Sequence, residues 1–137
     1  MLNIDDFSRF SAVETPFYYY DMDLFRRTLE TVGALSEKYG LKLHYAVKAN
    51  SEERILRMVS DAGFGADAVS ANEVVRAIEC GFSPDSVMFA GVGKTDREIR
   101  TALEAGIGCF NVESLPELEA IDAMAASMGR VAPVALR

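Results

Sequence analysis

Short runs of apolar residues recur along the chain at a nearly constant interval. Their centres are His44, Asp67, Met88, Phe110 and Val134, and successive centres lie 23, 21, 22 and 24 residues apart. Runs of this length, bounded by glycine and polar residues, are typical of buried strands. The pattern therefore predicts five strands separated by connections of similar length.

The segments between these runs, and the segment ahead of the first, carry apolar residues at the three-and-four spacing of an amphipathic helix. A glycine follows each such segment, where helices commonly end on a left-handed residue: Gly40, Gly63, Gly81, Gly106 and Gly129. Helix starts are predicted from capping boxes and from single capping residues. The boxes are Ser70 with Glu73, Thr95 with Glu98 and Ser114 with Glu117, and the single caps are Asp21 and Ser51.

Alternating strands and helices indicate an α/β fold with parallel strands, because a parallel connection needs about a dozen residues or more. A doubly wound sheet and a (β/α)8 barrel both have this order. Uniformly short connections, and the absence of a G-x-G-x-x-G motif after any strand, favour the barrel. A complete barrel takes about 250 residues. We therefore expect 137 residues to form the first half of a (β/α)8 TIM barrel, incomplete in this chain.

Composition and charge exclude several kinds of binding partner and location for the protein. Hydrophobic residues make up 50% of the chain and charged residues 26%, which indicates a globular domain. A net charge of −7 without a dense Lys/Arg cluster argues against nucleic acid. No apolar run approaches the roughly 18 residues of a membrane span, and no export signal is visible. Cys80 and Cys109 lie outside metal-binding spacing, which favours reduced thiols in the cytoplasm and offers no metal site.

Lys48 is the first candidate for chemistry. It follows His44 and Ala46 at alternate positions of the predicted first strand, so we expect it on the same face, at the carboxyl end. Active sites of (β/α)8 barrels lie at this end. An amine that is partly desolvated among apolar strands can form a Schiff base with a carbonyl group. The alternative is a strand-end lysine that reaches into water.

Asp67 is the second candidate, because it interrupts a strand that is otherwise suited to complete burial. A buried carboxylate is costly without a partner. Lys48, the group that Lys48 helps to bind, and Arg137 on the fifth strand are the candidate partners. The alternative is that Asp67 lies at the solvent end of the sheet.

Two further features are interpreted as structural. Residues 91–95 resemble a phosphate-binding loop, but the Walker pattern requires a glycine where Met88 stands. We therefore expect a turn followed by a helix cap. His44 is the only histidine, and without a second histidine or a cysteine pair it cannot form a metal site.

Six ordered blocks of sequence match the motifs of a known family. They are residues 15–21, 45–50, 65–70 with Glu73, 89–91, 110–114 with Glu117, and 135–137. Together they resemble the fold-type III pyridoxal-phosphate-dependent decarboxylases, whose barrel is of the alanine racemase-like type. The resemblance implies an N-terminal arm and strand in residues 1–20 and the N-terminal part of a cofactor-binding barrel in residues 21–137. The second half of the barrel and a C-terminal β domain would lie outside this chain, which would be inactive alone.

The resemblance also implies a cofactor and its ligands. The cofactor would be pyridoxal 5′-phosphate, and Lys48 corresponds to the catalytic lysine that binds it covalently. Asp67 and Arg137 correspond to residues beside the cofactor, where acid and guanidinium would compensate each other. The blocks are most similar to members that decarboxylate meso-diaminopimelate to L-lysine. Such enzymes are cytoplasmic homodimers that act on a small amino-acid substrate.

Several alternatives stay open. Relatives that act on carboxynorspermidine, arginine or ornithine share the lysine block. Pyridoxal-phosphate carrier proteins have the barrel and the lysine without the β domain, but their lysine lies in a different local context. Alanine racemases usually continue with Ala-Tyr-Gly-His after the lysine block, where this chain has Ser-Glu-Glu-Arg at residues 51–54. A non-catalytic folding or interaction fragment is the remaining alternative.

Overall fold

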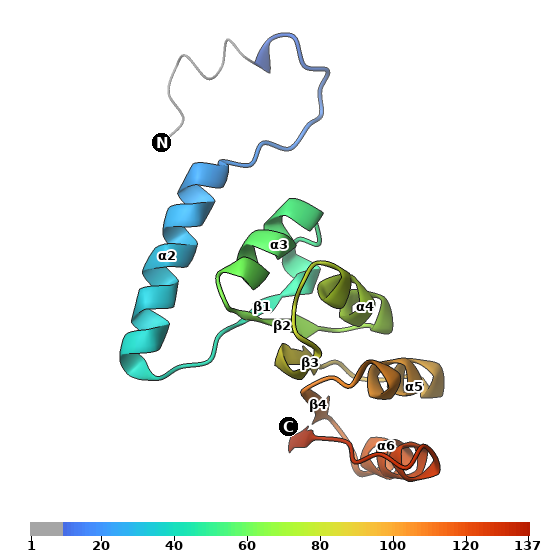
Figure 1. Ribbon diagram of the computed structural model, residues 1–137. Helices are drawn as coiled ribbons and strands as arrows, with labels where there is room; N and C mark the ends of the chain where they lie inside the picture. Colours follow the sequence, from blue (N-terminus) through green and yellow to red (C-terminus); the bar gives the residue numbers. More distant parts are fainter. Residues whose placement is uncertain (1–9) are drawn as a thin grey trace.

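The computed structural model describes residues 10–137 and contains one parallel sheet (Figure 1). The strands follow the order β1-β2-β3-β4-β5, and each pairs with the next one in the sequence. They are β1 (His44–Ala46), β2 (Gly65–Ala68), β3 (Val87–Phe89), β4 (Cys109–Val112) and β5 (Val134–Leu136). Each strand contains the centre predicted from the apolar runs, so the predicted repeat is confirmed.

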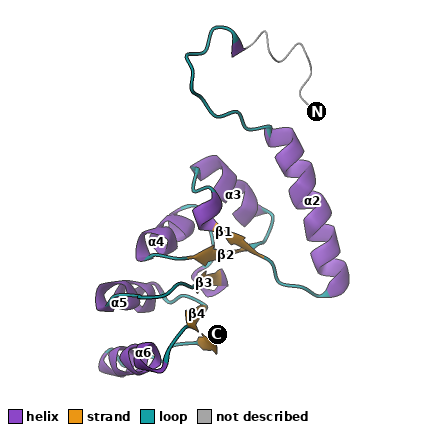
Figure 2. Ribbon diagram, turned by 180° about the vertical axis from the view of Figure 1, so that it is seen from behind, coloured by secondary structure: helices purple, strands orange, loops and turns teal. Residues whose placement is uncertain are grey.

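Helices precede the first strand and connect the others. They are α2 (Met22–Tyr39), α3 (Glu53–Asp61), α4 (Ala71–Glu79), α5 (Asp96–Ala105) and α6 (Leu115–Ser127), with short 3-10 turns η1 (Val47–Ala49) and η2 (Pro84–Ser86). The crossover helices α3 to α6 lie on one side of the sheet (Figure 2). A doubly wound sheet reverses its strand order and carries helices on both faces. Sequential order with helices on one face is that of consecutive βα units of a (β/α)8 barrel, which confirms the predicted fold class.

The helix starts follow the predicted caps closely. Asp21 Oδ1 accepts a hydrogen bond from the Leu24 N–H at 2.8 Å. At the other predicted starts a hydroxyl accepts from the N–H of the glutamate three residues later: Ser70, Thr95 and Ser114. Only Thr95 and Glu98 form a complete capping box, because Glu98 also accepts a hydrogen bond from the Thr95 N–H. Glu73 and Glu117 instead accept from the residue before the cap, at 2.8 and 3.2 Å.

The predicted cap at Ser51 is wrong by one residue. The Glu52 carboxylate caps α3 and accepts from the N–H groups of Arg54 and Ile55 at 2.8 and 3.2 Å. The longer carboxylate reaches two orphan donors of the first turn, which a serine hydroxyl at position 51 does not.

The aromatic run at residues 17–20 forms no strand, so the strand expected within residues 1–20 does not include it. Its side chains are exposed, and its rings contact each other, with Tyr18 and Tyr20 stacked at 6.4 Å between centroids. Phe10 also packs against Phe17 at 5.4 Å. No described strand lies beside this segment to accept its backbone hydrogen bonds, so alternation and aromatic content alone do not make a strand here. Residues 1–9 of the predicted arm lie outside the described residues.

The two faces of the sheet have different surroundings. Alternate residues pack under the helices and are fully or almost fully buried, as Ala66, Ala68, Phe89 and Phe110 show. The other alternate residues face away from α3 to α6. On that face the strand register aligns Ala46 with Asp67, Asp67 with Met88, and Met88 with Cys109. The carboxyl end of this face is where a barrel carries its chemistry.

Just before β4, the backbone at Gly108 lies in close contact with the segment that precedes β3. Its N–H donates to the carbonyl groups of Pro84 and Val87 at 2.9 and 3.0 Å, and a Cβ would collide with the Asp85 carbonyl group. We expect Gly108→Ala in the full-length protein to lower the free energy of unfolding by about 1–3 kcal/mol, the range for overpacking. Urea denaturation measures this change.

Gly33 in α2 provides the matched control. A Cβ there would meet the Phe64 ring at 3.8 Å, an ordinary contact. Because alanine favours helix more than glycine does, Gly33→Ala is expected to raise the unfolding free energy by up to about 1 kcal/mol. Equal denaturation midpoints for Gly108→Ala and the parent protein would contradict the close approach.

Candidate functional site at the carboxyl ends of the strands

Lys48 lies at the carboxyl end of β1, but not on the strand. The strand ends at Ala46, and residues 47–49 form the turn η1, so the predicted alternation with His44 and Ala46 does not extend to Lys48. Val47 is fully buried and anchors the turn in the core. The Lys48 side chain is exposed and, within residues 10–137, makes no hydrogen bond or ion pair. The structure therefore places this side chain in solvent and not among the apolar strands, where partial desolvation was expected.

The backbone that carries Lys48 is held from both sides. The Tyr45 hydroxyl donates to the Asn50 carbonyl oxygen at 3.2 Å, and Asn50 Oδ1 accepts from the Glu52 N–H at 2.9 Å. Burial raises the pKa of Tyr45 above its ordinary value, and the nearby Tyr20 adds to this rise. The phenol thus stays a hydrogen-bond donor to the loop across neutral pH. These contacts fix the turn between β1 and α3 on which Lys48 stands.

Asp67 occupies the middle of β2, between two fully buried alanines, Ala66 and Ala68, that face the helices. Its side chain lies on the opposite face, in register with Ala46 of β1. Asp67 Oδ1 is buried and has no hydrogen-bond partner among the described residues. Placement at the solvent end of the sheet, the alternative reading, does not hold. An unpartnered buried acceptor is costly, so this oxygen is a candidate contact for a bound group.

Arg137 follows β5 and is fixed to its neighbouring strand. Its N–H donates to the Val112 carbonyl oxygen at 2.9 Å, and its Nη1 lies 3.0 Å from Glu113 Oε1. A cavity of about 210 Å³ lies beside this pair at the ends of β4 and β5. Arg137 is not paired with Asp67, because β3 and β4 stand between their strands. The expected mutual compensation of acid and guanidinium is therefore wrong.

A buried ion pair lies at the same ends of the strands, and sequence reasoning missed it. Lys94 Nζ lies 2.6 Å from Glu117 Oε1, and the two side chains are only 2% and 9% exposed. Lys94 belongs to the segment that was interpreted as a turn. Its position five residues beyond the end of β3 is the one available signal, since the active sites of barrels lie at strand ends.

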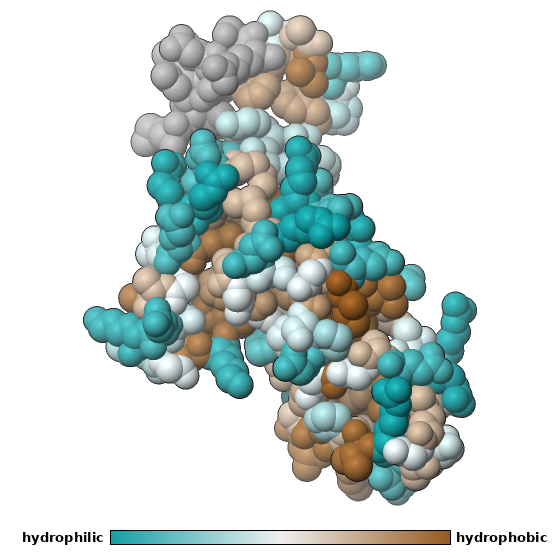
Figure 3. Space-filling view, viewed as in Figure 1, coloured by the Kyte–Doolittle hydropathy of each residue, from teal (hydrophilic) through white to brown (hydrophobic). Residues whose placement is uncertain are grey.

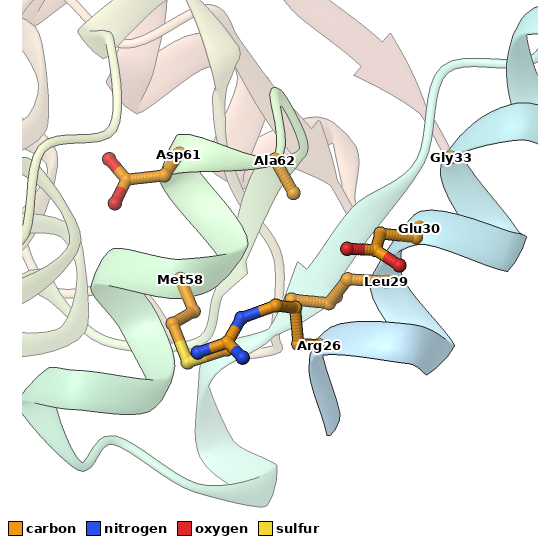
Figure 4. Close-up of a pocket in the computed structure, with 7 residues that line it drawn as sticks. All are labelled: Arg26, Leu29, Glu30, Gly33, Met58, Asp61 and Ala62. Carbon is orange, nitrogen blue, oxygen red and sulfur yellow. The ribbon is translucent and has the colours of Figure 1, made fainter. Parts of the chain in front are cut away.

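A groove of about 530 Å³ between α2 and α3 lies apart from these residues (Figure 4). Arg26 reaches from α2 toward Met58 of α3, and Glu30 and Asp61 add acidic groups to the lining. Hydrophilic side chains cover much of α3 and the outer part of α2 on the face seen in Figure 3. None of Lys48, Asp67 or Arg137 lines the groove, so we do not include it in the candidate site.

A sequence model of the pyridoxal-binding domain of pyridoxal-dependent decarboxylases matches residues 24–137. The chain belongs to this family. Within the described part of this family member, no helix is both long and apolar enough to cross a membrane.

Curated relatives and solved structures of the family are similar over nearly the whole chain. A diaminopimelate decarboxylase of Bacteroides thetaiotaomicron is 46% identical over 100% of this chain and 36% of its own length. The diaminopimelate decarboxylase of Helicobacter pylori, solved with L-lysine, superposes with a TM-score of 0.82 at 36% identity, covering 96% of this chain and 34% of that one. An arginine decarboxylase of Paramecium bursaria Chlorella virus gives a TM-score of 0.71 at 25% identity, over 82% and 30%. The chain thus spans about a third of the length of these relatives.

Proposed function

We propose that the full-length protein decarboxylates meso-diaminopimelate to L-lysine with pyridoxal 5′-phosphate, and that this chain supplies part of the cofactor-binding barrel. The observation that carries the proposal is the unpaired amine of Lys48 at the carboxyl end of β1, beside the strand that holds the unpartnered oxygen of Asp67. Membership of the pyridoxal-binding family supports it.

The residues present suit this cofactor. We assign Lys48 Nζ as the nucleophile that binds it covalently, because no described side chain competes for that amine. Asp67 Oδ1 is a buried acceptor that needs a donor, and a bound polar group would provide one. We assign Arg137 as a cationic contact at the end of β5. When bound, pyridoxal phosphate supplies the electron sink that makes loss of CO2 from an amino acid possible.

The substrate is proposed from the relatives. The Bacteroides and Helicobacter proteins are both named diaminopimelate decarboxylases. Arginine is the second candidate, favoured by the structural similarity to the viral arginine decarboxylase.

We propose further that the full-length protein is a cytoplasmic homodimer. Cys80 and Cys109 are free thiols, as expected in a reducing compartment. Several large apolar side chains of the arm and α2 are exposed, including Tyr18, Leu24 and Leu35, which leaves surface for further contacts.

A direct assay tests the substrate. With saturating pyridoxal phosphate, CO2 release by the full-length protein is measured from meso-diaminopimelate and, in parallel, from L-arginine, L-ornithine and carboxynorspermidine. We expect kcat/KM for meso-diaminopimelate to exceed the others by about 100-fold or more, because a site built for one polar side chain leaves groups unpaired with another. No turnover of meso-diaminopimelate would overturn the assignment, and turnover of arginine alone would establish the second candidate.

A further inference from the structure

The ammonium group of Lys94 is enclosed by oxygen atoms from three separate segments. Its Nζ donates to the carbonyl oxygens of Gly91 at 2.9 Å and Asn111 at 2.8 Å, and to Glu117 Oε1 at 2.6 Å. It also lies 5.3 Å from the centre of the Phe89 ring. All three ammonium hydrogens thus have acceptors, which is what a buried lysine requires.

This lysine joins the loops at the carboxyl ends of two strands. Gly91 follows β3, Asn111 belongs to β4 on the face away from the helices, and Glu117 lies in the first turn of α6. Among the described residues, the exposed ion pairs of the helices lie within one helix or between neighbouring helices, as Arg57 with Glu53 does in α3. Lys94 instead holds the rim of the sheet where the candidate site lies.

A series of three hydrogen bonds connects Lys94 to Arg137. Glu117 Oε1 accepts from Lys94, while its Oε2 accepts from the Glu113 N–H at 3.2 Å. Glu113 Oε1 in turn accepts from Arg137 Nη1 at 3.0 Å. The Glu113 side chain is 17% exposed, whereas that of Arg137 is 68% exposed. The buried end of this series is therefore rigid, and it fixes the backbone from which Glu113 holds the exposed guanidinium.

We propose that Lys94 is a positioning residue for the cofactor site: through Glu117 and Glu113 it sets the place of the Arg137 guanidinium. The inference rests on the proposed function, in which Arg137 contacts the cofactor. It goes beyond that function by assigning a role to a lysine that does not touch the cofactor. A purely structural role, in which Lys94 only ties the loops together, is the competing explanation.

A double-mutant cycle on cofactor binding separates the two explanations. The dissociation constant of pyridoxal phosphate is measured by absorbance titration for the full-length protein and for Lys94→Met, Arg137→Met and the double variant. We expect Lys94→Met to raise this constant about tenfold, a coupling typical of residues that share one hydrogen-bond network. In the Arg137→Met background, Lys94→Met should change it little, because the group that Lys94 positions is already gone.

A second variant tests the same series if Lys94→Met does not fold. Glu113→Gln weakens the hold on Arg137 without leaving a buried charge unpaired, and it should also raise the dissociation constant only when Arg137 is present. Arg57→Met, which removes a surface ion pair on α3, is the matched control and should leave binding unchanged.

The outcomes are distinguishable. Equal effects of Lys94→Met with and without Arg137 would overturn the positioning role while leaving the proposed function intact. No effect of Arg137→Met itself would overturn both the positioning role and the assignment of Arg137 as a cofactor contact, while the proposed decarboxylation would stand. Failure of the parent protein to bind pyridoxal phosphate would overturn the proposed function instead.

Discussion

Replacing Lys48 with alanine in the full-length protein is expected to abolish both decarboxylation and the visible absorbance band of the lysine-bound cofactor. The amine is exposed at the end of β1 and has no partner among the described residues, and in the proposed function it forms the covalent bond to the cofactor. Loss of covalent attachment and of a positioned proton-transfer group should lower kcat by at least about 1,000-fold. Absorbance spectra with added pyridoxal phosphate and CO2 release measure the two effects.

Two control variants test whether the effect depends on the Lys48 amine itself. Lys48→Arg keeps the positive charge but removes the nucleophilic amine, so it should behave like the alanine variant. Lys42→Ala removes an exposed lysine on the amino-terminal side of β1 and should leave the spectrum and the rate unchanged. An absorbance band that persists in Lys48→Ala or in Lys48→Arg would mean that another lysine binds the cofactor.

The fold could be predicted from the sequence because its signals are local. Each strand is a short apolar run, each helix start is marked by a cap, and the interval between strands leaves room for one crossover helix. Strand order then follows from connection length, since a short connection reaches only the neighbouring position in a sheet. The placement of Lys48 at a strand end has the same local origin. The end of the strand before Val47 could not be predicted from local signals, because a buried valine fits the apolar pattern of a strand and of a 3-10 turn equally well.

The contacts of the site could not be predicted in this way, because they depend on which segments the fold brings together. Lys94 follows Gly91 and Gly93, a context typical of an exposed turn, and its partner Glu117 is 23 positions away on another element. The resemblance places Arg137 and Asp67 beside the same cofactor, and opposite charge makes Arg137 one of the candidate partners of Asp67. The structure shows that Glu113, which directly follows the adjacent strand β4, is the carboxylate within reach of Arg137.

Replacing Asp67 with alanine is expected to have opposite effects on the two states of the protein. Without cofactor, Oδ1 is buried and unpartnered, and removing it should raise the free energy of unfolding by about 1 kcal/mol or more, the cost of an unsatisfied buried group. With cofactor, Asp67 is proposed to accept a hydrogen bond. Its loss should then weaken pyridoxal phosphate binding by about 10-fold to 100-fold, as for hydrogen bonds to charged groups.

Urea denaturation at several concentrations of pyridoxal phosphate measures both effects on the same full-length variant, because a ligand stabilises the folded state in proportion to its affinity. The unfolding curves of Asp67→Ala and the parent protein should therefore cross as the cofactor concentration rises. Asp61→Ala, which removes an exposed carboxylate at the end of α3, is the matched control and should shift neither quantity by more than about 0.5 kcal/mol. A variant that is less stable than the parent without cofactor would show that Asp67 has a partner inside the protein, and its oxygen would no longer point to a bound group.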